Sequence, residues 1–171
     1  GKTQLYIRLI EQAIAAGKSA LSLLPEIALT AQITARLKLH FGDKLGVYHS
    51  KFNDNERAEV WHKVMKNEFQ IIVGARSSVF LPFQDLGIIL VDEEHESSYK
   101  QYDPAPRYHA RDTAIYLGYI HQTKVLLGSA TPSIESFYNA KSDKYGFVQL
   151  LERYGNAQLP DIHIVDIPQE G

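Results

Sequence analysis

One stretch limits the possible folds more than any other: residues 87–95, which read Gly-Ile-Ile-Leu-Val-Asp-Glu-Glu-His. Four apolar residues run together and are followed at once by three acids and a histidine. A continuous run of β-branched residues and leucine is typical of a strand buried on both faces, as in parallel sheets. Polar residues after such a strand lie at the edge where α/β folds bind ligands. The stretch therefore predicts a ligand site at the carboxyl end of a buried strand.

The chemistry of this site depends on how the acids are used. The stretch fits a Walker B strand, in which Asp92 would hold Mg²⁺ and Glu93 would polarise the attacking water. The alternative is a strand that ends in a solvated acidic turn, because short motifs have a real false-positive rate.

A second motif opens the chain, where Gly1-Lys2-Thr3 leads into a helical pattern at residues 4–16. Gly-Lys-Thr at a helix start is the end of a P-loop, whose lysine reaches the β- and γ-phosphates and whose hydroxyl ligates Mg²⁺. Alone, the triplet also fits an ordinary helix start. In a parallel sheet, both motifs can reach the same carboxyl edge, and their joint occurrence favours a nucleoside triphosphatase.

The composition is that of a soluble globular domain, with 44% hydrophobic and 22% charged residues among 171. No apolar run approaches the ~20 residues of a membrane span, and no secretory leader is recognisable. The absence of cysteine excludes disulfides and cysteine-ligated zinc. The net charge of -2 means that any contact with nucleic acid must be local. Because the chain opens without methionine, we expect a piece of a larger protein.

Strand and helix patterns alternate along the chain, which predicts a parallel sheet with helices on both faces. Strands are expected at residues 20–24, 45–49, 69–73, 87–91, 124–127, 147–151 and 162–167. Helices are expected at residues 4–16, 29–41, from a capping box at Asn53 and Glu56, at 110–121, and from Pro132 as a first helical residue. Residues 97–109 are predicted to be an aromatic-rich loop, because Pro104 and Pro106 prevent a helix.

Two other motifs are near misses. Gly17-Lys18-Ser19 repeats the P-loop ending, but it closes a helix and precedes a strand, so we reject it. His95-Glu96 with Tyr99 falls one ligand short of the metalloprotease pattern H-E-x-x-H, and it follows a strand, so zinc is not expected here.

Five ordered motifs make the sequence recognisable: residues 23–30, 73–83, 91–101, 107–112 and 128–133. Together they closely resemble the PriA family, the bacterial superfamily 2 DNA helicases that restart stalled replication forks. The match runs from residue 1 to about residue 137 and extends loosely to the end. The Asp-Glu-Glu-His form of motif II, with a tyrosine-rich loop behind it, is specific to this resemblance.

The resemblance implies a RecA-like P-loop NTPase domain of three layers, with its first strand truncated. Residues 1–171 would be the first motor lobe, and residues 159–171 would lead toward a second lobe. The implied cofactors are ATP and Mg²⁺; zinc would belong only to the part of the family protein outside this chain. Nucleotide would be bound by Gly1, Lys2, Thr3, Asp92 and Glu93, of which Lys2, Asp92 and Glu93 would be catalytic and Thr3 and Asp92 would hold the metal.

The same resemblance implies the remaining site residues. His95 would link the nucleotide site to Ser129 and Thr131 of motif III. DNA contacts would come from motifs Ia and Ib and from the aromatic-rich loop, that is, from Pro25, Glu26, Thr30, Arg76, Ser77, Ser78, Tyr99, Lys100, Tyr102, Arg107 and Tyr108. Aromatic rings stack on any base, while Lys100 and Arg107 would pair with phosphates. The alternative for the tyrosines is packing between helices. We expect this loop to be mobile without DNA, because it should lack a local hydrogen-bond ladder.

The function implied is an ATP-dependent DNA helicase motor for replication fork restart, working in the bacterial cytoplasm. Its partners would be single-stranded and forked DNA, together with primosome and single-strand-binding proteins, and no membrane. Alone, the chain should hydrolyse little ATP. Two alternatives remain: another superfamily 2 translocase, or a nucleic-acid-binding module whose ATP site is vestigial.

Overall fold

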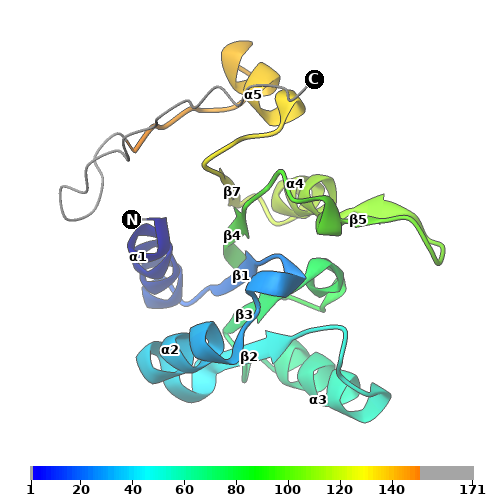
Figure 1. The fold of residues 1–171 in the computed structure, drawn as a ribbon. Coiled ribbons are helices and arrows are strands. Elements are labelled where there is room, and N and C mark those ends of the chain that lie inside the picture. Colours follow the sequence, from blue (N-terminus) through cyan, green and yellow to red (C-terminus); the bar gives the residue numbers. More distant parts are fainter. Residues whose placement is uncertain (1, 151–171) are drawn as a thin grey trace, which may run out of the picture.

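A computed structural model describes residues 2–150 of the chain. Its centre is a sheet of five parallel strands in the order β2-β3-β1-β4-β7 (Figure 1). The strands are β1 (Ser19–Leu23), β2 (Leu45–Tyr48), β3 (Ile71–Gly74), β4 (Leu86–Asp92) and β7 (Lys124–Gly128). The predicted mainly parallel sheet is confirmed, and each of these strands lies within two residues of its predicted range.

Within the described part of the chain, five α-helices accompany the sheet: α1 (Lys2–Ala15), α2 (Ala31–Phe41), α3 (Asp54–Met65), α4 (Ala110–Ile120) and α5 (Ile134–Lys141). One core cluster joins α1 and α2 to strand residues such as Ala20 and Leu90. The other joins α3 and α4 to alternate residues of the same strands, such as Leu21 and Ile89. Because neighbouring strand residues face opposite ways, the two clusters lie on opposite faces. The domain therefore has the three predicted layers.

Local signals in the sequence explain several helix boundaries. Asn53 caps α3, and its side chain and that of Glu56 exchange hydrogen bonds with each other's backbone N–H, which confirms the capping box. Gly17 follows α1 with a φ of +75°, the left-handed conformation that favours glycine at a helix end.

Three local predictions are wrong. Pro132 is not the first helical residue, because Ser133 is the N-cap of α5 and accepts a hydrogen bond from Ser136 N. The strand predicted at residues 147–151 is not found, because residues 146–150 have no strand conformation. The strand predicted at residues 162–167 lies outside the described residues, so it stays a prediction. Residues 97–109 are not an open loop: Tyr99 ends a short 3-10 helix, after which β5 (Lys100–Gln101) pairs antiparallel with β6 (Tyr108–His109).

No helix within residues 2–150 has the length and apolar character needed to cross a bilayer.

Candidate active site

The two sequence motifs meet at the carboxyl edge of the sheet. Lys2, at the first turn of α1, has its Nζ 3.4 Å from Asp92 Oδ1 and donates a hydrogen bond to Glu93 Oε1. Asp92 ends β4, and its register partner Gly128 ends β7. Residues ninety positions apart are thus brought into contact. Thr3 lies exposed on α1, where its predicted role as a metal ligand stays a prediction, and Gly1 is outside the described residues.

The charges at this edge are mutually stabilising. Partial burial opposes the charged form of Lys2, but the hydrogen bond to Glu93 and the negative charges of Asp92 and Glu93 outweigh it and raise the pKa of Lys2. The three side chains keep between 23% and 35% of their surface exposed, so a ligand can reach them from solvent.

The donor set suits a magnesium–phosphate ligand. Within residues 2–150, no three His, Cys, Asp or Glu side chains gather as a metal cage. Mg²⁺ does not need one, because it is usually held by one or two carboxylates, waters and substrate phosphates. Asp92 and Glu93 supply such carboxylates, and Lys2 supplies a cation for a phosphate.

Tyr6 is a site residue that the sequence reasoning missed. Its hydroxyl donates a hydrogen bond of 2.8 Å to Asp92 Oδ1. Burial and the negative charge of Asp92 raise the pKa of Tyr6, so its proton remains available for this bond. The sequence signal for Tyr6 was its position four residues after Lys2, because residues one helical turn apart lie on the same face of a helix. Gly128 makes the approach possible, because an added Cβ there would lie 1.8 Å from the Tyr6 oxygen.

The prediction for Tyr99 is corrected. Only 1% of its surface is exposed, and its hydroxyl donates to the backbone oxygen of Asp92 at 2.7 Å. Its ring cannot stack on a base, so the alternative of packing was right for this tyrosine. The sequence could not show that Tyr99 is buried, because it belongs to an aromatic-rich segment in which some side chains are buried and others are exposed.

The other members of the aromatic-rich segment lie on a hairpin that projects from the domain (Figure 1). Tyr102 is 68% exposed, Arg107 is exposed and Lys100 is half-buried. Tyr108 is half-buried and packs edge-on against Phe80. The hairpin does have local hydrogen bonds, including two from the Gln101 side chain to the carbonyls of Pro104 and Pro106, so the expectation of a segment without them was wrong.

The residues predicted from motifs Ia and Ib follow β1 and β3, at the same edge of the sheet as the acids. Glu26 accepts a hydrogen bond from Ser50, and the Thr30 hydroxyl caps α2. Arg76 donates to the carbonyl of Ser98, which ties it to the segment before the hairpin. Pro25 is buried two residues after the end of β1, and Ser77 is half-buried.

Ser78 is a correction. It is fully buried, and its hydroxyl has no hydrogen-bond partner among the described residues. It packs against Gly74, where an added Cβ would lie 1.8 Å from the Ser78 oxygen. Ser78 therefore packs inside the domain and cannot contact a DNA backbone.

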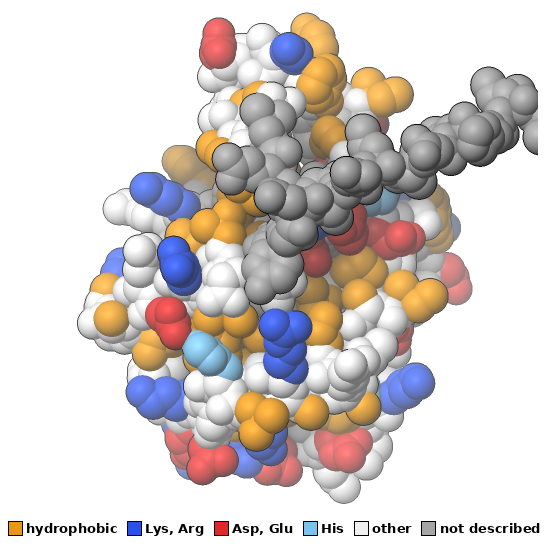
Figure 2. Space-filling model, turned by 60° about the vertical axis from the view of Figure 1, so that its left-hand side comes forward, with side chains coloured by type: hydrophobic (Ala, Val, Ile, Leu, Met, Phe, Trp, Pro, Cys, Tyr) orange, Lys and Arg blue, Asp and Glu red, His pale blue; other side chains and the backbone are white. Residues whose placement is uncertain are grey.

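The basic side chains are dispersed on the surface seen in Figure 2. Lysine and arginine side chains among the described residues alternate there with acidic and apolar ones. The described residues form no continuous basic patch on that face.

His95 connects the acids to the turn after β7. Its Nδ1 lies 2.8 Å from Ser129 Oγ and 3.8 Å from Glu93 Oε2, and its Nε2 lies 3.4 Å from Thr131 Oγ1. The predicted neighbours of His95 are therefore present, and their coupling role stays a prediction.

Glu94 has no predicted role, yet it is the most buried of the three acids, with 1% of its surface exposed. Four hydrogen bonds hold it, from Arg111 Nη1, Ser133 N, Ser133 Oγ and Ser136 Oγ, at 2.7–3.1 Å. Burial disfavours its charge, but these bonds outweigh it and lower the pKa of Glu94. The sequence signal for a buried acid was the run of three acids after a buried strand, because the chain turns there and one of the three side chains points inward.

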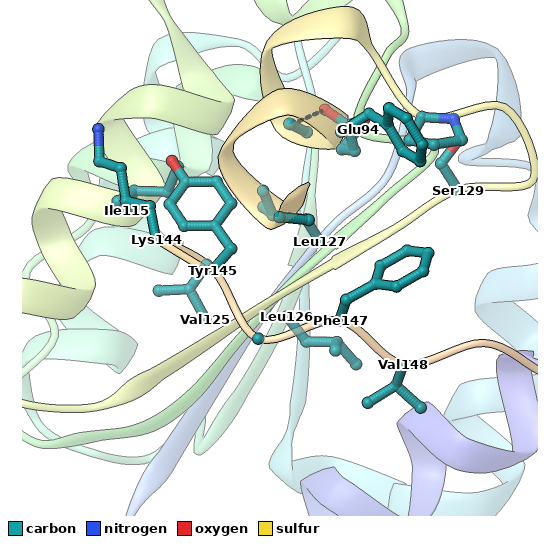
Figure 3. Close-up of a pocket in the computed structure, with 15 residues that line it drawn as sticks. Glu94, Ile115, Val125, Leu126, Leu127, Ser129, Lys144, Tyr145, Phe147 and Val148 are labelled. Carbon is teal, nitrogen blue, oxygen red and sulfur yellow. Dashed lines mark hydrogen bonds between the residues drawn. The ribbon is translucent and has the colours of Figure 1, made fainter. Parts of the chain in front are cut away.

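A cavity of about 410 Å³ lies beside this cluster, along β7 (Figure 3). Its lining is mostly apolar, with Leu126, Leu127, Phe147 and Val148 among its side chains, and Glu94 at its rim. Lys2, Asp92 and Glu93 do not line it, so it is distinct from the candidate active site.

The sequence was compared with known families and proteins. Residues 1–139 match the family model described as "DEAD/DEAH box helicase". Three relatives described as "Replication restart protein PriA" are 45%, 44% and 42% identical over 170 residues; they come from Chlamydia trachomatis, Bacillus subtilis and Rickettsia felis. Each alignment covers 99% of this chain but only 23%, 21% and 26% of the relative, so the chain spans about a quarter of their length.

A solved structure with a similar fold is the C-terminal domain of Saccharomyces cerevisiae Dbp5. It superposes with a TM-score of 0.50 and 11% identity, covering 77% of this chain and 71% of that one. At this identity the similarity concerns the fold alone.

Proposed function

We propose a function from one premise: this chain belongs to the DEAD/DEAH box helicase family. Residues 1–171 are the first motor lobe of an ATP-dependent DNA helicase that acts in replication restart, and residues 159–171 lead toward the second lobe. The observation that carries the proposal is the contact of Lys2 with Asp92 and Glu93 at the carboxyl edge of the sheet. The similarity to three replication restart proteins supports the biological setting.

The catalytic roles follow from this contact. ATP would supply the phosphoryl group, and Mg²⁺ would neutralise the charge that develops during its transfer. Lys2, with Gly1 and Thr3, binds the phosphates at the start of α1, where unpaired backbone N–H groups add positive potential. Asp92, oriented by Tyr6, would hold the metal together with Thr3. Glu93 orients the attacking water and accepts its proton.

DNA is bound at the same edge. Tyr102 presents an exposed ring on which a base of any sequence can stack, and Lys100 and Arg107 pair with phosphates. The backbone of the strand is contacted around Arg76, Ser77 and the segment from Pro25 to Thr30. Hydrolysis in the whole protein drives translocation on single-stranded DNA and opens forks, in the bacterial cytoplasm and in company with primosome and single-strand-binding proteins.

The 171-residue chain alone should bind nucleotide weakly and hydrolyse little of it. It spans about a quarter of its relatives' length, and motors of this class complete their catalytic site with an arginine from a second lobe. Calorimetric titration of the isolated chain with MgATP checks this, and tight binding would contradict it.

The deciding experiment uses the full-length protein with Asp92→Asn and Glu93→Gln combined. These changes keep the shape of both side chains and remove their charge. We expect DNA-stimulated ATP hydrolysis to be lost and binding of single-stranded DNA to be retained. Unchanged turnover would refute the proposed roles. A wild-type protein that binds DNA without hydrolysing ATP would instead establish the binding module with a vestigial ATP site.

A further inference from the structure

The side chain of Lys2 contacts both carboxylates at the candidate metal position. We propose that Lys2 controls the entry of a divalent cation: its ammonium neutralises Asp92 and Glu93, and the cation binds them well only when a phosphate chain draws Lys2 away. The inference rests on the function proposed above. It adds the requirement that the metal and the nucleotide bind together.

The ammonium of Lys2 contacts two adjacent acidic residues at once. Its Nζ lies 3.4 Å from Asp92 Oδ1 and donates a hydrogen bond to Glu93 Oε1. Among the described residues, no other lysine or arginine forms an ion pair with either carboxylate. Asp92 Oδ1 also accepts the hydrogen bond of the Tyr6 hydroxyl, so that oxygen has two partners. A divalent cation that approaches these oxygens therefore competes with Lys2 for them.

The charges explain why Lys2 wins this competition when no phosphate is bound. Two carboxylates and one ammonium sum to a single negative charge. A divalent cation on the same oxygens would lie close to the ammonium, and like charges a few ångström apart repel each other. The Lys2 side chain is only 31% exposed, so water screens this repulsion in part. A triphosphate chain supplies the negative charges that both cations need.

The position of Lys2 on α1 allows the exchange of partners. Lys2 is the first residue of this helix, where the unpaired N–H groups create a positive potential that disfavours a cation. The two acids compensate for that unfavourable position. A phosphate at the same helix end is attracted by the N–H groups as well as by the ammonium. The flexible four-carbon stem of a lysine can turn from a carboxylate to a phosphate without a movement of the backbone.

The exchange makes the binding of metal and of phosphate cooperative. Phosphate withdraws the ammonium from the acids, and a metal on the acids releases the ammonium for phosphate. Such coupling is reciprocal, so each ligand strengthens the binding of the other by the same factor. When Lys2 is removed, a divalent cation should therefore bind the acids more tightly in the absence of phosphate.

The competing explanation is that Lys2 binds phosphate and has no influence on the metal. Both explanations predict that the loss of Lys2 weakens ATP binding, so ATP hydrolysis cannot separate them. They differ in the affinity for a divalent cation without nucleotide. This affinity should rise if Lys2 competes with the metal, and it should stay unchanged if Lys2 serves phosphate alone.

The test measures Mn²⁺ binding to the full-length protein without nucleotide, by electron paramagnetic resonance of the free ion. Lys2→Met removes the ammonium and keeps most of the stem, and it should raise the Mn²⁺ affinity roughly ten-fold, within the usual range of coupling between two ligands. Lys2→Arg keeps the charge and should keep the affinity of the wild type. The matched control is Lys18→Met, because Lys18 forms an ion pair of the same length, 3.4 Å, with Asp85 beyond the other end of α1. This control should leave the Mn²⁺ affinity unchanged.

A double variant assigns the additional Mn²⁺ to the candidate active site. Asp92→Asn combined with Lys2→Met removes both the competing ammonium and the carboxylate, so the gain in affinity should disappear. Mn²⁺ bound elsewhere on the full-length protein would be unaffected by Asp92→Asn.

Each outcome supports or overturns the inference. Equal Mn²⁺ affinities of Lys2→Met and wild type would overturn it, and so would a gain that Lys18→Met shares or that survives Asp92→Asn. If Lys2→Met fails to fold, as judged by its melting temperature, Lys2→Gln takes its place. DNA-stimulated ATP hydrolysis that persists in Lys2→Met would instead refute the proposed function, and it is measured independently of Mn²⁺ binding.

Discussion

At the scale of single residues, the candidate active site depends on side chains that hold the proposed catalytic groups as much as on those groups themselves. Tyr6 is the clearest case, because it fixes the carboxylate of Asp92 through one hydrogen bond. Hydrogen bonds to charged groups contribute more to stability than those between neutral groups. Asp92 is therefore expected to lose its orientation when this hydroxyl is removed.

The first prediction is that Tyr6→Phe lowers the free energy of unfolding by about 1–2 kcal/mol. In the full-length protein, the Mg²⁺ concentration for half-maximal ATP hydrolysis should rise. Urea denaturation and a Mg²⁺ titration measure the two effects. Tyr116→Phe is the matched control, because Tyr116 is 64% exposed on α4, and its effect should stay within about 0.5 kcal/mol. Identical behaviour of the two variants would disprove the role of Tyr6.

The second prediction concerns Glu94→Gln and pH. The pKa of Glu94 is lower in the folded than in the unfolded chain, so its carboxylate contributes stability above the unfolded pKa of about 4.3. That contribution is lost as the pH falls through the lower, folded pKa. The difference in unfolding free energy between wild type and Glu94→Gln should thus be constant near neutral pH and shrink in acid.

Denaturation curves recorded from neutral pH to below pH 4 measure this difference. The exposed neighbour Glu135 provides the control, since Glu135→Gln should change stability by no more than about 0.5 kcal/mol at neutral pH. A difference that grows on acidification would contradict the account of Glu94.

The sequence predicts which residues form the candidate active site better than it predicts how deeply a side chain is buried. Lys2, Asp92 and Glu93 belong to short motifs whose local spacing carries their chemistry, and the structure brings them together. Tyr99 and Ser78 belong to equally recognisable segments, but both are buried. Whether a side chain points outward there depends on distant packing partners, such as the end of β4 for Tyr99, which no local pattern contains.

At the scale of helices and strands, the contact between α1 and β7 is set by a glycine. Gly128 ends β7 opposite Asp92, and the Tyr6 hydroxyl occupies the place where a Cβ would lie. The third prediction is that Gly128→Ala lowers the free energy of unfolding by about 1–3 kcal/mol, because α1 must move or Tyr6 must leave Asp92.

Chemical denaturation measures the effect of Gly128→Ala, and Gly146→Ala is its control. An added Cβ at Gly146 meets nothing within 4 Å, so that change should be neutral or slightly stabilising. Equal stability of both variants would show that the Tyr6 hydroxyl does not pack closely against Gly128.

The helices and strands that could be predicted are those long enough for their apolar residues to show a helical or strand-like spacing. Strand β4 and helix α1 were placed within two residues, because burial on both faces and helical spacing are local signals. The hairpin was missed because β5 and β6 have two residues each and flank two prolines. Residues 147–150 have strand-like composition, but β propensity describes a pleated and half-buried surface, and a strand forms only beside a partner.

At the scale of the whole molecule, the sheet separates two hydrophobic clusters, and the candidate active site lies at the carboxyl edge of the sheet. Lys2, the acids and the residues after β1 and β3 share that edge, while the net charge of the chain is only -2. Under the proposed function, attraction to DNA would therefore have to come from a few cations close to the DNA strand.

The fourth prediction is that Arg107→Ala in the full-length protein reduces the salt dependence of DNA binding. For single strands, the slope of log affinity against log salt is about -0.7 per neutralised phosphate, so its magnitude should fall by about 0.7. Titrations of labelled single-stranded DNA at several salt concentrations measure it. Lys66→Ala is the control, because Lys66 ends α3 at the opposite edge of the sheet, and it should leave the slope unchanged. An unaltered slope for Arg107→Ala would remove Arg107 from the interface.

The left-handed backbone of Glu93 has an evolutionary consequence. An L-residue in that conformation costs about 1–2 kcal/mol, a penalty that glycine escapes and asparagine partly escapes. Selection for thermal stability alone would drift toward those two residues at this position. Glutamate at position 93 therefore places a carboxylate at the sheet edge at the expense of thermal resistance, and Glu93→Gly should raise the melting temperature while removing that carboxylate.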